Sequence, residues 1–147
     1  SRVGGKAQSP AFRAVAGDLR IDMSQFEELE TFARFGTRLD EETRERLKRG
    51  RAVRAILRQQ ERQPLPIVEQ IIQLYCALQG LFDSMPTDRL EDAVAIIRTD
   101  AMRAFGDVGD RIIAGRALNE ADRESILTLC RQALENRQLP GRTNADA

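Results

Sequence analysis

Histidine and tryptophan are both absent from this 147-residue chain. The lack of histidine removes the commonest general base and the commonest zinc ligand. With one tyrosine, the chain also has little aromatic surface for stacking on bases or sugars. The two cysteines, Cys76 and Cys130, are too few for a zinc site or a disulfide scaffold, so we expect them to be free and buried. The residues predict no metal site and no self-contained active site.

An excess of charge of one sign is missing as well, because 23 basic residues balance 23 acidic ones. This neutrality argues against a general nucleic-acid binder and against a membrane-surface protein. No apolar run approaches the roughly 18–20 residues that span a bilayer. The chain begins at Ser1 without a signal-peptide pattern, so we expect it to be a piece of a longer protein.

Helical periodicity dominates the segments that glycine and proline separate, and no segment has the alternation of a strand. The sequence therefore predicts an all-α fold, a helical bundle of about six helices with short loops. The expected helices occupy residues 10–19, 24–35, 40–62, 67–82, 87–105 and 119–134. The three glycines of residues 106–115 predict at most a short turn there, and the polar residues 140–147 predict a disordered tail.

Several local signals set these boundaries. Ser24 followed by Glu27 has the spacing of a capping box, and Gly50 indicates a break or kink in the third helix. Thr87 or Asp88 is expected to cap the fifth helix, and Asn119 the last. The apolar residues between positions 67 and 82 crowd most of a helix surface, which predicts the central, buried helix.

The strongest charge feature is a basic stretch between positions 44 and 62, opposed there only by Glu45 and Glu61. It consists of Arg44, Arg46, Lys48, Arg49, Arg51, Arg54, Arg58 and Arg62. Without aromatics among them, these residues favour a solvated face or a protein-docking face over nucleic-acid binding. One hypothesis is therefore a stand-alone helical protein–protein interaction module without a nucleotide role.

The first residues support a different hypothesis. Arg2 lies beside Gly4 and Gly5 at the edge of the helical region. An arginine on such a loop is suited to act in trans as an arginine finger, because its planar guanidinium stabilises charge on a transferring phosphoryl group.

Short stretches through most of the chain resemble the last third of the alpha subunit of F-type ATP synthase. They are Ser1-Arg2-Val3-Gly4 with Ala7-Gln8, Val15-Ala16-Gly17, Leu29-Glu30 with Phe32-Ala33, Phe35-Gly36 and Leu39-Asp40, Arg49-Gly50, Leu57 with Gln59, Pro64 and Glu69-Gln70. The resemblance implies that residues 1–9 end a nucleotide-binding domain and that residues 10–139 form the C-terminal helical bundle.

The function that the resemblance implies is that of a multi-subunit complex. Alpha subunits alternate with catalytic beta subunits in a hexamer around a central gamma stalk, held by a peripheral stalk at the cytoplasmic face of a bacterial inner membrane. The complex couples ion flow to ATP synthesis or hydrolysis, with no nucleic acid and with membrane contact only through the assembly. Arg2 matches the arginine that enters the adjacent beta site. Gln59 matches a glutamine that contacts the adenine of ATP or ADP, and the resemblance implies that the full-length alpha subunit binds this nucleotide with Mg²⁺.

The chain also departs from the family pattern. Glu61 replaces a second adenine-contacting glutamine, and residues 79–83 differ from the usual run. These changes indicate a divergent alpha subunit. No phosphate-binding Gly-x-x-x-x-Gly-Lys motif is present, so the chain alone is expected neither to hold a cofactor nor to turn over ATP.

Overall fold

A computed structural model describes residues 10–35 and 38–137 of the chain. The expected loop at residues 1–9 and tail at 140–147 lie outside these ranges, and so do Arg2 and Gly36. The described residues form helices and no strand, which confirms the all-α fold. The α-helices are α2 (Pro10–Arg34), α3 (Glu41–Arg62), α4 (Ile67–Leu78), α5 (Leu90–Ile96), α6 (Gly106–Ile113) and α7 (Glu120–Asn136).

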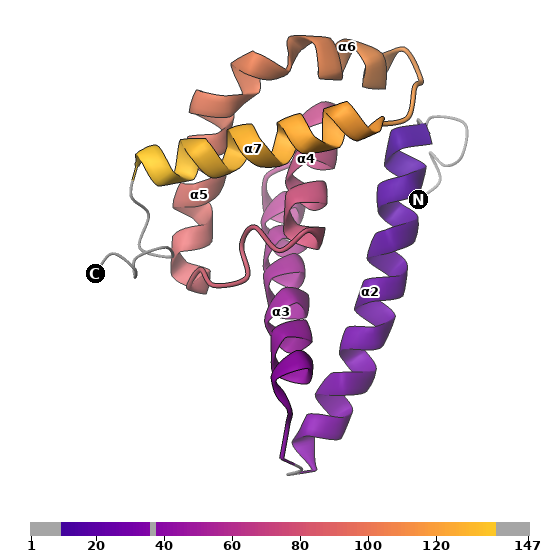
Figure 1. Ribbon diagram of the computed structural model, residues 1–147, viewed down its shortest axis with the longest axis vertical. Helices are drawn as coiled ribbons and strands as arrows, with labels where there is room; N and C mark the ends of the chain where they lie inside the picture. Colours follow the sequence, from indigo (N-terminus) through magenta and orange to yellow (C-terminus); the bar gives the residue numbers. More distant parts are fainter. Residues whose placement is uncertain (1–9, 36–37, 138–147) are drawn as a thin grey trace.

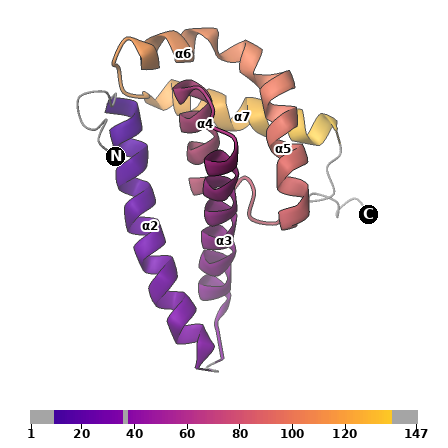
Figure 2. The same ribbon diagram turned by 180° about the vertical axis from the view of Figure 1, so that it is seen from behind.

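The helices pack as a long antiparallel pair joined to a more compact body. In Figure 1, α2 and α3 run side by side and converge where α2 ends and α3 begins. Helix α4 returns along α3, and α7 crosses α4 (Figures 1 and 2). Helix α6 lies at the same end of the body as α7. One core therefore joins α4 both to the elements that follow it and to α2 and α3, through buried residues such as Val15 and Val53. The converging ends of α2 and α3 extend beyond that core.

Helix α2 is continuous, so the predicted break before Ser24 is wrong. Val15 and Phe26 are both buried, and they lie eleven residues, about three helical turns, apart on one face. Packing of that single face on α3 and α4 favours one straight helix over a local cap at the exposed Ser24. Pro10 is the first described residue of this helix.

Helix α3 also runs without interruption, because Gly50 serves packing and does not break the helix. A side-chain carbon at Gly50 would overlap the ring of Phe26 from α2. The missing side chain thus lets an aromatic ring lie directly on the α3 backbone. The start of the helix is as predicted: Asp40 is its N-cap and accepts a hydrogen bond of 2.8 Å from the Thr43 N–H. The hydrogen bonds with Thr43 hold the pKa of Asp40 below its usual value.

Helix α4 is the buried centre that the sequence predicts. Ile71, Ile72 and Cys76 are 0% exposed, and Phe82 in the following turn is equally inaccessible. Cys130 of α7 is also fully buried, and both cysteines are free thiols, as predicted. A hydrogen bond with the Cys130 thiol, together with burial, raises the pKa of Cys76 well above its usual value. The two thiols therefore belong to the core contact between α4 and α7.

The region from Thr87 to Ile113 differs most from the expectation. Neither Thr87 nor Asp88 caps it: Pro86 occupies the N-cap of a short 3-10 turn, η1 (Thr87–Arg89), without a side-chain hydrogen bond. A π-helical turn, η2 (Ile97–Ala101), and a 3-10 turn, η3 (Met102–Phe105), then separate α5 from α6. The helical path bends there, as Figure 1 shows. Helix α6 occupies residues for which only a short turn was predicted, because Val108 and Ile112 gain burial that outweighs the poor helix propensity of the glycines.

Helix α7 begins as predicted. The Asn119 side chain accepts from the Asp122 N–H at 2.7 Å, and the Asp122 carboxylate accepts from the Asn119 N–H at 3.2 Å. These reciprocal bonds form a capping box. Ile126, Cys130 and Leu134 face the core.

Candidate functional site

The sequence singles out three functional residues, and the structure describes two of them. Arg2 lies outside the described residues. Gln59 and Glu61 lie in the last turns of α3, two positions apart. Because successive residues are about 100° apart around a helix, these two side chains leave α3 in nearly opposite directions. Gln59 is partly buried and lines a hollow, whereas Glu61 is exposed and does not line it.

The hollow at Gln59 lies between the end of α3 and the turn that leads into α5. Its volume is about 150 Å³. The wall on α3 consists of Ala55, Arg58, Gln59 and Arg62, and the opposite wall of Thr87, Asp88, Leu90 and Glu91. Basic and acidic side chains therefore both border this small hollow, and the Gln59 amide lies on its α3 wall.

The Gln59 amide is available for binding. The backbone carbonyl oxygen of Gln59 accepts a hydrogen bond from the Gln63 N–H at 3.0 Å, at the end of α3. The side chain of Gln59 makes no hydrogen bond with any residue that the structure describes. An amide offers a donor and an acceptor together, which is what the edge of a nucleobase requires.

Gln60 fixes the end of α3 against α4. Its side-chain Nε2 donates to Oε1 of Gln73 at 3.2 Å, and Gln73 is only 2% exposed. This pair was not predicted from the sequence, although a glutamine inside the apolar pattern of residues 67–82 was a signal. This part-buried bond holds the last turns of α3, which carry Gln59, against α4.

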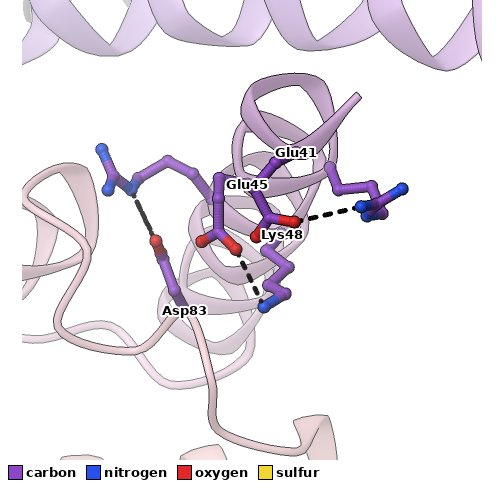
Figure 3. A network of polar contacts seen from close by, with 6 residues as sticks. Glu41, Glu45, Lys48 and Asp83 are labelled. Carbon is purple, nitrogen blue, oxygen red and sulfur yellow. Dashed lines mark hydrogen bonds and ion pairs between the residues drawn. The ribbon is translucent and has the colours of Figure 1, made fainter. Parts of the chain in front are cut away.

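Most of the basic stretch is neutralised by acidic side chains. On α3 itself, Arg44 pairs with Glu41, Arg46 with Glu42 and Lys48 with Glu45, at 3.0, 3.0 and 3.2 Å. Figure 3 shows Glu45 turned toward Lys48, and Glu41 and Asp83 each joined to an arginine of α3. These exposed pairs each stabilise the helix only slightly.

Two arginines of α3 instead tie separate elements together. Arg49 donates from Nε to both carboxylate oxygens of Asp83, at 3.0 and 3.1 Å, and from Nη1 to the Leu78 carbonyl. Burial of Asp83 raises the pKa of its carboxyl group, while the neighbouring Arg49 opposes that shift. The guanidinium carbon of Arg54 lies 4.6 Å from the ring centre of Phe26, and Arg54 forms an ion pair with Glu30 at 3.3 Å. Phe26 and Glu30 both belong to α2.

Three basic residues of the stretch remain, namely Arg51, Arg58 and Arg62. All three are exposed, and none forms an ion pair within the described part of the chain. The predicted solvated or docking face therefore reduces to these three arginines.

The comparison with known families decides where this fold belongs. The family described as "ATP synthase alpha/beta chain, C terminal domain" matches residues 8–133. The chain belongs to this family. The match covers all of the described helices except the end of α7, which confirms the resemblance found in the sequence.

The relatives of this ATP synthase domain are alpha subunits, although the family contains both alpha and beta chains. The chain is 52% identical over 134 residues to "ATP synthase subunit alpha 1" of Dinoroseobacter shibae, and 48% identical over 134 residues to "ATP synthase subunit alpha 2" of Syntrophus aciditrophicus. Each match covers 91% of this chain and 26% of the relative. The chain is thus the C-terminal region of an alpha subunit, and it spans about a quarter of the length of these relatives.

Metal sites and membrane spans are absent from the described part of this ATP synthase domain. Among residues 10–35 and 38–137, no group of three or more acidic or cysteine side chains is placed to hold a metal ion. In the same ranges, no helix combines the length and the apolarity needed to cross a membrane.

Proposed function

We propose that this domain works within the alpha subunit of a rotary F-type ATP synthase at the cytoplasmic face of a bacterial inner membrane. There it packs beside beta subunits in an alternating hexamer, around a central gamma stalk and with a peripheral stalk outside. The whole complex couples transmembrane ion flow to ATP synthesis or hydrolysis. The observation that carries the proposal is the 48–52% identity to alpha subunits across 91% of the chain.

The departures from the family pattern, Glu61 among them, support assignment to a divergent ATPase. The relatives' names number their alpha subunits 1 or 2, which is compatible with that assignment.

The catalytic contribution that we propose for the chain is Arg2, as an arginine finger to the adjacent beta subunit. Its guanidinium would stabilise the charge that develops on the transferred phosphoryl group. We expect Arg2→Ala in the full complex to leave nucleotide binding intact and to reduce turnover by about 10³–10⁵-fold, the value typical of such fingers. Arg2→Lys should fail to restore the rate, because lysine lacks the planar fork.

Steady-state ATPase assays of the purified complex test this proposal. Arg20→Ala is a suitable control, because Arg20 is an exposed arginine of α2. Normal turnover in the Arg2→Ala complex would refute the role of Arg2. Loss of ring assembly would be visible by gel filtration and would be separated from loss of catalysis.

For the full-length alpha subunit, we propose that Gln59 contacts the adenine of ATP or ADP bound with Mg²⁺. The free amide and the hollow beside it support this contact. In this proposal Gln59 holds only the base of a nucleotide that the alpha subunit binds without turning it over, and phosphoryl transfer belongs to the beta-subunit site. Glu61 has no amide donor, so it cannot reproduce the donor half of a glutamine contact.

We expect Gln59→Ala in the full-length protein to weaken ATP binding about five- to tenfold, which is the net effect of one or two hydrogen bonds. Glu61→Gln should leave the ATP affinity unchanged, because position 61 does not line the hollow beside Gln59. Equilibrium binding of ATP tests both variants, and Gln132→Ala on the exposed surface of α7 serves as the control. Unchanged ATP affinity in Gln59→Ala would contradict the contact.

A further inference from the structure

A hollow of about 310 Å³ lies where the first turns of α2 meet α4 and the loop that joins α6 to α7. In both ribbon views, the start of α2 lies beside that loop (Figures 1 and 2). We call this space the α2–α4–α7 hollow. It shares no lining residue with the hollow at Gln59, so a ligand in it does not displace a base held by Gln59.

The buried part of the lining of the α2–α4–α7 hollow is aliphatic. Ala11, Val15 and Leu118 line it and are 1%, 4% and 7% exposed. The volume is at the lower end of the range of small-molecule sites, which begins at about 300 Å³. The hollow therefore suits a small ligand with a compact apolar body.

The polar part of the lining consists of four side chains without a partner. They are Asp18 of α2, Tyr75 of α4, Gln79 at the end of α4 and Arg123 of α7. Within residues 10–35 and 38–137, none of these side chains forms a hydrogen bond or an ion pair. Asp18 and Arg123 carry opposite charges, but they border the hollow without pairing with each other. One anionic and one cationic group thus remain available to the same ligand.

The hydroxyl group of Tyr75 lies near both charges. Burial raises the pKa of this hydroxyl group above its usual value, Arg123 opposes the shift and Asp18 reinforces it. The phenol therefore stays protonated at neutral pH. In that form it can donate a hydrogen bond to an anionic group and accept one from a cationic group.

We propose that the α2–α4–α7 hollow binds a small zwitterion with an apolar body, of the class of free aliphatic amino acids. The Asp18 carboxylate would accept from the ligand's ammonium group, and the Arg123 guanidinium would donate to the ligand's carboxylate. Tyr75 and Gln79 would add neutral hydrogen bonds. The aliphatic body of the ligand would cover the buried part of the lining.

The mixed charge of the lining selects against other classes of ligand. A phosphate or another simple anion would meet Asp18 as well as Arg123, and a simple cation would meet the same two groups with the opposite sign. A partner helix is about 10 Å wide and does not fit into a space of about 310 Å³. A zwitterion satisfies both charged side chains at once, and neither is left unpaired beside a bound ligand.

Three ligands with the same branched carbon chain test the proposal. L-Leucine carries both charges, isopentylamine lacks the carboxylate, and 4-methylpentanoate lacks the ammonium group. Calorimetry with the full-length alpha subunit measures the affinities, and amide shifts in the NMR spectrum of the 147-residue chain locate the site. We expect leucine to bind about tenfold more tightly than either analogue, because each analogue loses one charge-assisted hydrogen bond. The shifts should concentrate in the first turns of α2, the second half of α4 and the start of α7.

Two neutralising variants assign the charges. Asp18→Asn should weaken leucine binding about tenfold and leave the affinity for 4-methylpentanoate unchanged. Arg123→Gln should weaken leucine binding by a similar factor and leave the affinity for isopentylamine unchanged. Asp110→Asn and Arg131→Gln make the same changes in net charge at exposed positions that do not line the hollow, so both should bind leucine like the parent.

Four outcomes would overturn the proposal. Leucine binding no tighter than that of an analogue would show that the hollow does not use both charges. Equal loss in the control variants would show that only net charge matters. Shifts confined to other elements would place binding on another surface. Absence of saturable leucine binding at millimolar concentrations would show that the hollow holds only solvent.

Discussion

At the scale of single residues, Asp122 combines burial, charge and a structural role. It is 2% exposed and accepts hydrogen bonds from the Asn119 N–H and from Arg111 of α6. The bond from Arg111 and the backbone bond from Asn119 lower the pKa of the Asp122 carboxyl group, and together they outweigh the opposing effect of burial. One carboxylate thus caps α7 and joins it to α6.

This lowered pKa predicts how stability depends on pH. An acid whose folded pKa lies below its unfolded value stabilises the fold above the unfolded pKa, here 3.8, and loses that effect as pH falls through the folded pKa. We expect Asp122→Asn to lower the free energy of unfolding by about 1–3 kcal/mol at pH 7. The difference from the parent should shrink toward pH 2.

Urea unfolding at pH 7 and near pH 2 measures the effect. Glu120→Gln changes an exposed acid in the same helical turn and should be close to neutral at both pH values. A deficit in Asp122→Asn that stays constant across this range would contradict the role of the charge.

At the scale of elements, the pairing of α2 with α3 depends on the contact between Phe26 and Gly50. A glycine in the middle of a helix costs about 1 kcal/mol in intrinsic helix stability relative to alanine. The Phe26 ring lies where a methyl group on residue 50 would be, and Arg54 stacks on the same ring. Close packing of two helices here outweighs the local propensity of one of them.

We therefore expect Gly50→Ala to destabilise the chain by about 1–3 kcal/mol, because the ring of Phe26 must move. Gly17→Ala is the matched control, since nothing lies within 4 Å of a side chain at that position of α2. It should be neutral or stabilise by up to about 1 kcal/mol. Thermal melting of both variants measures the difference, and a stabilised Gly50→Ala chain would show that the contact is not tight.

The same contact shows why some element boundaries could not be predicted from the sequence. The start signals at Asp40 and Asn119 act within one turn, and both were predicted correctly. The break signals at Ser24 and Gly50 are also local, but packing between α2 and α3 overrides them. That packing involves Phe26 and Gly50, which are too far apart along the chain for a local pattern to connect them.

At the scale of the whole molecule, the buried surface of α4 holds the body together. Its face contacts α2, α3, α6 and α7. The sequence predicted this core, because apolar residues around nearly a whole helix have no other stable environment. For the candidate site, the sequence indicated Gln59 by resemblance, but it could not show that Gln59 and Glu61 point apart or that most basic side chains are paired.

We expect Ile71→Asp to abolish the cooperative unfolding transition, because an unpaired charge at a fully buried position costs several kcal/mol. Leu78→Asp should have the same effect. Ile113→Asp is the control, since that side chain is 72% exposed and should tolerate the charge. Circular dichroism during heating separates the variants, and an unchanged melting curve for Ile71→Asp would refute the core assignment.

The junction between α5 and α6 changes the direction of the chain while it preserves helical phase. A π turn is wound more loosely than an α-helix, and a 3-10 turn more tightly, so η2 followed by η3 nearly cancels in rotation. The buried positions accordingly keep ordinary α-helical intervals through the bend: Leu90, Val94, Ile97, Ala101, Phe105, Val108 and Ile112. A pattern of apolar residues records rotation about an axis and not the direction of that axis. Two helices can therefore share one uninterrupted periodicity and still enclose a corner of the core.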